Sequence, residues 1–373
     1  MDFRWRLPGL PQRARRALDH VSGTASGPPL DPGLRITVNF HPDRISGGLP
    51  ILESLARDGA YHSQFVTGTS NGGLTAHPGG DRTLWESRIF GGAYDDADPA
   101  ERPVYGALDF RRQVVGAAPR FGSSHLRLSG AVLARATFCY PDSSAGPGDF
   151  GVAGAMPLIS LAEADEQDAL NDYIEAQVHG GVLLDRDVEA LVLDASYRGT
   201  PVETAARRLP FPLIWHPGYR LTVAELRRHA DYRGPEYADL GARISEHGLI
   251  TPRVIGDAAR TARYDLQDLK MVWHTLARFG APEGAGTARL PPPPTVPPPT
   301  GVAADPGDPA VMAGTDTAAD PGGRTSMAPT VTAADPGDPA SMAPTGTAAD
   351  PGDPASMAPT GAAAVQIPPE RSG

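Results

Sequence analysis

A change of composition near residue 280 limits which part of this chain can fold. Residues 281–373 contain no Phe, Trp, Tyr, His or Cys, and they carry 20 of the chain's 40 prolines. Such a segment cannot bury enough apolar surface to offset the entropy lost on ordering. We therefore expect a basic N-terminal helix and linker at 1–33, a single folded domain at 34–280 and a disordered tail at 281–373.

The tail also repeats itself. From residue 302 a 15-residue unit recurs, close to TAADPGDPASMAPTG, with copies that begin at Val302, Thr317, Thr332 and Thr347. The unit has no apolar face on which neighbouring copies could stack, so a solenoid is excluded. We expect a flexible or extended tail after the proline-rich spacer at 291–299.

The charge of the folding part is nearly balanced. The chain has a formal net charge of −11, of which the tail contributes −7 through 10 acidic and 3 basic residues, leaving −4 for residues 1–280. This balance argues against nucleic-acid binding through a broad basic surface. Five arginines before Leu18 predict a short basic helix after Pro11.

The chain carries no sequence signal for a membrane or for export. No apolar run approaches the roughly 20 residues that span a bilayer, and the N-terminus lacks the apolar core of a signal peptide. The single cysteine, Cys139, excludes an internal disulfide and fits a reducing cytosol. We expect a cytoplasmic location, while secretion without a signal peptide and the oligomeric state stay open.

The segment 173–180 has the clearest period of two in the chain, which is typical of a β-strand. Ile174, Ala176 and Val178 would form a buried side, and the intervening polar residues an exposed or cleft-facing side. That polar side is a row of hydrogen-bonding groups, some able to do acid–base work. Its members are Tyr173, Glu175, Gln177 and His179. The chain then returns as a second apolar strand at 188–194, which predicts a strand pair.

Other periodic segments complete the expected fold. A strand at 34–41 ends on His41-Pro42-Asp43-Arg44, where the proline stops the ladder. We expect an α+β domain, with a mixed, split sheet of short strands mainly at 34–195 and a helical region mainly at 200–280 that packs on it. Further strands are predicted at 61–67 and 103–110, and a loop that enters a strand at 120–128. Helices are predicted at 49–59, 201–208, 222–230, 235–247 and 251–279, the last as one long helix or two, broken near Tyr264-Asp265.

The segment 68–74 is a polar, glycine-rich loop. It could line a nucleotide, with Asn71 as a contact, but it lacks the Gly-Lys-Ser/Thr pattern of a phosphate loop. A flexible pair of turns explains the same residues equally well.

Familiar catalytic motifs are absent from the sequence, which has no Gly-x-Ser-x-Gly, His-Glu-x-x-His or Cys-x-x-Cys. Cys139 is better explained as a buried thiol than as a nucleophile. A metal-dependent hydrolase stays open, although the spacings match no tight ligand motif; a non-catalytic binding module stays open too. The candidate metal ligands are His41, Asp43, His62, His77, Asp81, His125, His179 and His216.

Four motifs together resemble a bacterial family of proteins of unknown function, over about residues 35–280. They are His41-Pro42-Asp43-Arg44, the Ser-Gln-Phe…Ser-Asn-Gly-Gly-Leu segment at 63–74, Tyr105-Gly106-Ala107-Leu108, and Glu175-Ala176-Gln177-Val178-His179-Gly180.

The layout also resembles ADP-ribosyltransferases. In those enzymes a first strand carries His or Arg, as His41 does here. A helix follows with a segment like Leu49-Pro50-Ile51-Leu52, and a late strand carries the catalytic glutamate into a hairpin, as Glu175 does. The resemblance implies NAD as substrate, with transfer to a protein or nucleic-acid acceptor, or NAD hydrolysis on the same scaffold.

The resemblance also implies roles for individual residues. Glu175 would bind the nicotinamide ribose and stabilise an oxocarbenium-like transition state by its charge. His41 would bind the adenosine-side ribose, and Tyr61 or Tyr105 would stack on the nicotinamide. The remaining roles are support of the glutamate by Ser123 or Ser124 and orientation of the acceptor by Gln177.

Two departures from the transferase pattern concern the acceptor and the serine. Arginine-modifying enzymes have glutamate at both ends of a Glu-x-Glu, whereas the second position here is Gln177. Ser123-Ser124 also lacks the usual Ser-Thr-Ser form. The identity of the acceptor is therefore left undetermined.

Overall fold

The computed structural model describes residues 9–68 and 76–282, and every structural statement below refers to these residues. Asn71 and the repeats of the tail lie outside them.

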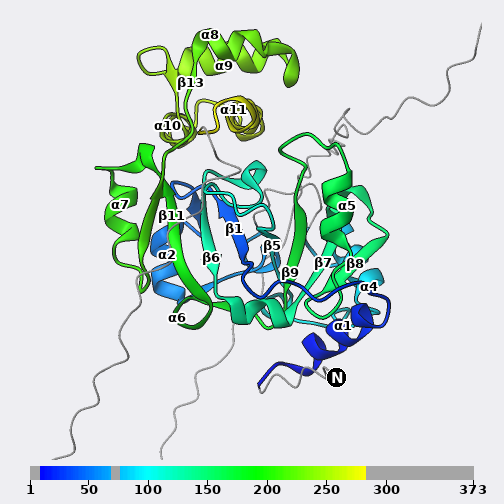
Figure 1. The fold of residues 1–373 in the computed structure, drawn as a ribbon. Coiled ribbons are helices and arrows are strands. Elements are labelled where there is room, and N and C mark those ends of the chain that lie inside the picture. The colour runs from blue at the N-terminus through cyan, green and yellow to red at the C-terminus, as the bar shows by residue number, and fades with distance from the viewer. Residues whose placement is uncertain (1–8, 69–75, 283–373) are drawn as a thin grey trace, which may run out of the picture. The chain divides into compact units, whose positions relative to one another are not determined.

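An eight-stranded mixed sheet forms the centre of the fold, in the order β12-β11-β6-β1-β5-β9-β7-β8 (Figure 1). Neighbouring strands run antiparallel except for β11 and β12, which run parallel. The predicted α+β class, with a sheet of short strands, is confirmed. The strands are β1 (Ile36–Phe40), β5 (Val104–Leu108), β6 (Ser124–Leu128), β7 (Ala136–Tyr140), β8 (Asp149–Val152), β9 (Ile174–Val178), β11 (Val188–Asp194) and β12 (Leu213–His216).

Shorter elements surround this sheet. Three two-stranded ribbons are β2 (Ile45–Ser46) with β3 (Leu49–Pro50), β4 (Ala60–Tyr61) with β10 (Val182–Leu183), and β13 (Leu221–Thr222) with β14 (Leu249–Ile250). The helices are α1 (Gln12–Ser22), α2 (Ile51–Asp58), α3 (Gln64–Thr67), α4 (Asp81–Ile89), α5 (Leu158–Ala164), α6 (Leu184–Asp187), α7 (Pro201–Ala206), α8 (Val223–Arg228), α9 (Pro235–Ile244), α10 (Pro252–Arg260) and α11 (Leu266–Phe279). Short 3-10 helices are η1 (Pro99–Glu101), η2 (Pro119–Phe121), η3 (Gly130–Arg135), η4 (Ser143–Ala145), η5 (Ala195–Tyr197) and η6 (Ala230–Tyr232).

Two local predictions need correction. The segment 61–67 is not one strand, because only Tyr61 continues β4 and the chain then turns into α3. The predicted strand pair at 173–180 and 188–194 does not form either. β9 pairs with β5 and β7, whereas β11 pairs with β6 and β12 on the other side of β1.

The sheet opens between β1 and β5. These strands pair only at Ile36↔Leu108 and Thr37↔Ala107. Beyond Thr37, β1 continues along β6 as far as Phe40, while β5 pairs with β9 over its whole length. The two strands therefore diverge toward the end of β1, and a gap opens that side chains and neighbouring loops must line.

Both faces of β9 are buried, which corrects the expectation of an exposed polar side for most of its length. Gln177 and His179 have no exposed surface, and Glu175 is 6% exposed. Trp85 and Phe90 pack over this polar face from α4 and the turn that ends it, together with Ala17 of α1. The opposite face belongs to the main apolar core, to which α2, α5 and α7 contribute. Helices distant in sequence thus cover both faces of a strand whose alternating pattern predicts one solvent-exposed face.

Helices α8 to α11 gather at one end of the sheet (Figure 1) and enclose a core of their own. The predicted break near Tyr264-Asp265 is present, since Asp265 caps α11 by accepting the backbone N–H groups of Gln267 and Asp268. The apolar stripe of α11 is buried except for Leu266, which is 49% exposed.

This helical layer braces the end of β1. The ring of His41 meets the ring of Trp273 edge-on, with centroids 4.9 Å apart. The Asp43 carboxylate accepts a hydrogen bond from the Tyr197 hydroxyl at 3.0 Å. It also lies against Gly256 of α10, where an added Cβ would fall 1.4 Å from Asp43 Oδ2. A glycine here is required by the close approach of the carboxylate.

We expect Gly256→Ala to destabilise the protein although alanine favours helices. The helix gains about 1 kcal/mol, but Asp43 must leave its site and the Tyr197 hydrogen bond is lost. Overpacking and an unpaired buried group cost about 1–3 kcal/mol each, so the free energy of unfolding should fall by about 1–5 kcal/mol once the helix gain is subtracted. Urea unfolding measures the change. Gly148→Ala is the control, because nothing lies within 4 Å of its added Cβ; equal stability of the two variants would contradict the prediction.

Candidate functional site

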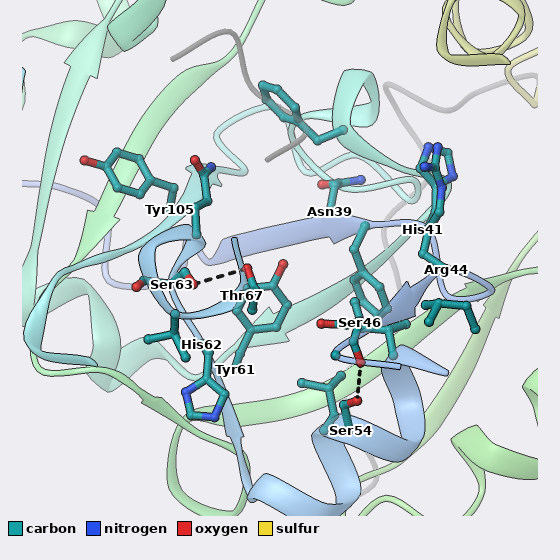
Figure 2. Close-up of a pocket in the computed structure, with 18 of the residues that line it drawn as sticks. Asn39, His41, Arg44, Ser46, Ser54, Tyr61, His62, Ser63, Thr67 and Tyr105 are labelled. Atoms are coloured by element: carbon teal, nitrogen blue, oxygen red, sulfur yellow. Dashed lines mark hydrogen bonds between the residues drawn. The ribbon is translucent and has the colours of Figure 1, made fainter. Parts of the chain in front are cut away.

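A cavity of about 490 Å³ lies where β1 and β5 diverge. It is lined by the end of β1, the loop that follows, α2, β4, α3 and parts of α4, β5, β9 and α10. Four of the residues to which the transferase resemblance gives a role line it together: His41, Tyr61, Tyr105 and Glu175. Two further candidate metal ligands, Asp43 and His62, line it as well. Figure 2 shows Tyr61 near the middle of the view, with Tyr105 above it on the left and His41 above it on the right.

Glu175 is a buried acid of this cavity, as Asp43 is, and it accepts several hydrogen bonds. Its Oε2 accepts from Ser143, from Oγ at 2.8 Å and from the backbone N–H at 3.3 Å. Its Oε1 accepts from Gln177 Nε2 at 3.0 Å, and Arg82 Nη1 lies 3.8 Å away. Burial raises the pKa of Glu175 above its ordinary value of 4.5, while the positive charge of Arg82 and the donors from Ser143 and Gln177 oppose the increase.

A chain of buried hydrogen bonds extends from Glu175 along the covered face of the sheet. The Thr137 hydroxyl donates to Gln177 Oε1 at 2.8 Å. His179 Nε2 lies 3.0 Å from the same hydroxyl, and His179 Nδ1 lies 2.8 Å from the Tyr94 hydroxyl. Because Thr137 has one proton and gives it to Gln177, His179 Nε2 is the donor to Thr137 and Nδ1 accepts from Tyr94. We name Tyr94, His179, Thr137 and Gln177 the donor chain; it turns the Gln177 amide nitrogen toward Glu175.

A second cluster holds Tyr105 and Arg82. The Tyr105 hydroxyl donates to Glu86 Oε1 at 2.7 Å, and Arg102 Nη1 donates to Glu86 Oε2 at 2.5 Å. The Arg82 guanidinium lies over the Tyr105 ring, 4.1 Å from its centroid. One face of Tyr105 is therefore already covered. Tyr61 is half-buried instead, and burial raises its pKa to about 12.

His41 is neutral at physiological pH. Burial lowers its pKa to about 3, and the positive charge of Arg44 adds to the decrease. A neutral imidazole offers one donor and one acceptor nitrogen, which suits hydroxyl groups of a ligand better than anions.

One family model matches most of the described part of the chain. A family model described as Protein of unknown function (DUF3626) matches residues 35–162 and 153–279. The chain belongs to this family. No curated protein matches the sequence.

The structure does not bring Ser123 and Ser124 of this DUF3626 protein to the cavity. Ser123 precedes β6 and Ser124 is its first residue. Ser124 pairs with Phe40 of β1, and its Oγ accepts a hydrogen bond from the backbone N–H of Asp194. β6 and β9 are three strand spacings apart, roughly 14 Å. The serine that contacts Glu175 is Ser143. Its place follows from the pairing Cys139↔Glu175, which sets the turn after β7 beside the acid.

Gln177 also lies away from the cavity lining, since its amide is engaged by Glu175 and Thr137. Sequence reasoning missed Arg82, Ser143 and Thr137. None of the three belongs to a motif that marks a contact with Glu175, because the contacts arise from strand pairing and from the packing of α4.

The metal alternative gains no support. Among residues 9–68 and 76–282 there is no group of three or more His, Cys, Asp or Glu side chains that could hold a metal ion. His62 lies 3.4 Å from Asp58, whereas His179 belongs to the donor chain and His216 lies against Ser123. Within the same ranges, none of the helices has the length and apolar character that crossing a membrane requires.

The raised pKa of the Asp43 carboxyl should make the free energy of unfolding depend on pH. Burial raises its pKa from 3.8 to about 6, opposed by the Tyr197 hydrogen bond. Between these values the folded protein keeps a proton that the unfolded chain has released, so stability falls as pH rises from about 4 to 6. Asp43→Asn removes this loss, and its stability relative to wild type should increase by about 2–3 kcal/mol across the window. Urea unfolding of both proteins from pH 4 to 7 tests this prediction. A free energy of unfolding that changes with pH in the same way for both would contradict it.

Removing the Thr137 hydroxyl should break the donor chain. In Thr137→Val the Gln177 Oε1 and His179 Nε2 lose their buried partner, which costs about 1–3 kcal/mol of unfolding free energy. Thr137→Ser is the matched control because it keeps the hydroxyl and loses only a methyl group, worth about 0.8 kcal/mol. Equal free energies of unfolding for Thr137→Val and Thr137→Ser would show that the donor chain contributes little to stability.

Proposed function

We propose that this protein acts on NAD, as an ADP-ribosyltransferase or as an NAD glycohydrolase, with Glu175 as the group that stabilises the transition state. The observation that carries the proposal is the meeting of His41, from the end of β1, and Glu175, from β9, in one cavity of about 490 Å³. Cavities of this size accommodate small molecules and cofactors.

The reaction sets a clear requirement for the site. The bond between nicotinamide and ribose breaks, its electron pair leaves with nicotinamide, and positive charge develops on the ribose. A water molecule or an acceptor nucleophile then forms the new bond to the ribose carbon and releases a proton. A fixed negative charge beside the ribose lowers the barrier because it interacts with the charge that develops.

Glu175 meets this requirement through its surroundings. The carboxylate is 6% exposed, so water screens its charge little. Ser143 and Gln177 hold both oxygens in place, and Arg82 favours the ionised form. In this proposal the donor chain has a positioning role, and Gln177 orients the acid rather than the acceptor.

The remaining roles follow from the cavity. Neutral His41 would bind ribose hydroxyls. Tyr61 is the better stacking partner for nicotinamide, because Arg82 already covers one face of Tyr105. The acceptor, if there is one, is a protein or a nucleic acid, and the proposed setting is the cytoplasm of a bacterium.

A non-catalytic binding module is less well supported. That alternative predicts a Glu175 that points into open solvent with no pocket beside it. The observed acid is buried and lines the cavity.

Release of nicotinamide from NAD by the full-length chain tests the proposal. We expect Glu175→Gln, which keeps the shape and removes the charge, to slow release by about 100-fold or more. Glu163→Gln is the control, since Glu163 is exposed on α5 outside the cavity, and it should match wild type. Absence of release by the wild-type protein, together with no NAD binding in calorimetry, would refute the function.

A further inference from the structure

The charges that line the cavity do not balance. Three carboxylates and four arginines line it. Each carboxylate has an arginine near it: Arg57 Nε lies 2.6 Å from Asp58, Arg82 Nη1 3.8 Å from Glu175, and Arg260 Nη1 3.8 Å from Asp43. The fourth arginine is Arg44.

Arg44 differs from the other three in its surroundings. Within the described ranges its guanidinium makes no hydrogen bond and no ion pair, although the residue is half-buried. Its backbone is fixed, because its N–H donates to the His41 carbonyl at 3.3 Å and its carbonyl accepts from Ile51 at 2.9 Å. Figure 2 shows it next to His41 at the cavity. Burial raises the pKa of the Asp43 carboxyl, and the charge of Arg44 opposes this increase without forming an ion pair. A cation held at a cavity wall with no described carboxylate in ion-pair contact is suited to an anionic ligand.

We propose that Arg44 binds a phosphate group of the ligand, and that the cavity takes a nucleotide that carries a diphosphate. A guanidinium matches phosphate oxygens with two parallel N–H donors, which makes arginine the residue of choice for this group. The choice of a diphosphate nucleotide rests on the proposed function, in which the ligand is NAD; the anion site itself rests on the surplus charge.

The walls favour a nucleotide over free phosphate. Six large apolar side chains are exposed in the described part of the chain, and three of them, Ile45, Val66 and Leu266, line this cavity. Tyr61 adds an aromatic ring to the same lining. Apolar surface of this kind is suited to an aromatic base or a sugar face. A site that binds only inorganic anions does not require such an apolar surface.

Calorimetry with ADP-ribose and with inorganic pyrophosphate, on the full-length protein, tests the assignment. We expect Arg44→Gln to weaken ADP-ribose binding about 10- to 100-fold, the effect of losing a charge-assisted pair. Arg57→Gln is the matched control: it removes a cavity arginine that Asp58 already pairs, and it should change the affinity less than threefold. Arg44→Lys keeps the charge but loses the two parallel N–H donors, so its affinity for ADP-ribose should lie between those of wild type and Arg44→Gln.

The outcomes separate this inference from the proposed function. Arg44-dependent binding of ADP-ribose supports the inference even if the protein releases no nicotinamide, a result that would refute only the function. Nicotinamide release with an unchanged KM in Arg44→Gln would overturn the inference and leave the function standing. The inference is also overturned if wild type binds no ADP-ribose, if Arg57→Gln weakens binding as much as Arg44→Gln, or if pyrophosphate binds as tightly as ADP-ribose.

Discussion

The separation of β1 from β5 is the constraint on which the candidate site depends. Two central antiparallel strands that stayed paired would leave no space for a ligand. Here the ladder between them ends at Thr37↔Ala107, because β1 follows β6 while β5 follows β9. Gly106 lies at the point of separation, where a side chain would come within 2.7 Å of the Thr37 carbonyl oxygen. The cavity therefore arises from the strand topology, and the loop that follows β1 completes its lining.

Burial of polar groups beside that cavity requires that they satisfy one another. Glu175, Gln177 and His179 point to the same face of β9, and α1 and α4 exclude water from much of it. An unpaired group there would cost about 1–3 kcal/mol, so each side chain is engaged by the next. The same arrangement that makes this face stable also fixes the orientation of Glu175, the acid of β9 that lines the cavity.

The helical layer of α8 to α11 links stability to the site. It contacts the end of β1 through Trp273 against His41 and through Gly256 against Asp43. Both contacts bury titratable groups and shift their pKa values in the direction of the neutral form. Arg44 follows directly in the chain and keeps its charge toward the cavity. Residues 41–44 thus join a side that packs against the helical layer to a side that lines the cavity.

The sequence by itself determined the elements that depend on neighbouring residues. The period of two at 174–178, the cap at Asp265 and the left-handed Gly59 that ends α2 are local, and all are present. Only the tertiary structure decided which elements meet. It placed β11 away from β9, set Ser143 rather than Ser124 beside Glu175, and brought Leu266 of α11 to the cavity. Strand order arises from packing between distant segments, and the alternation of apolar residues along one strand is the same whichever strand lies next to it.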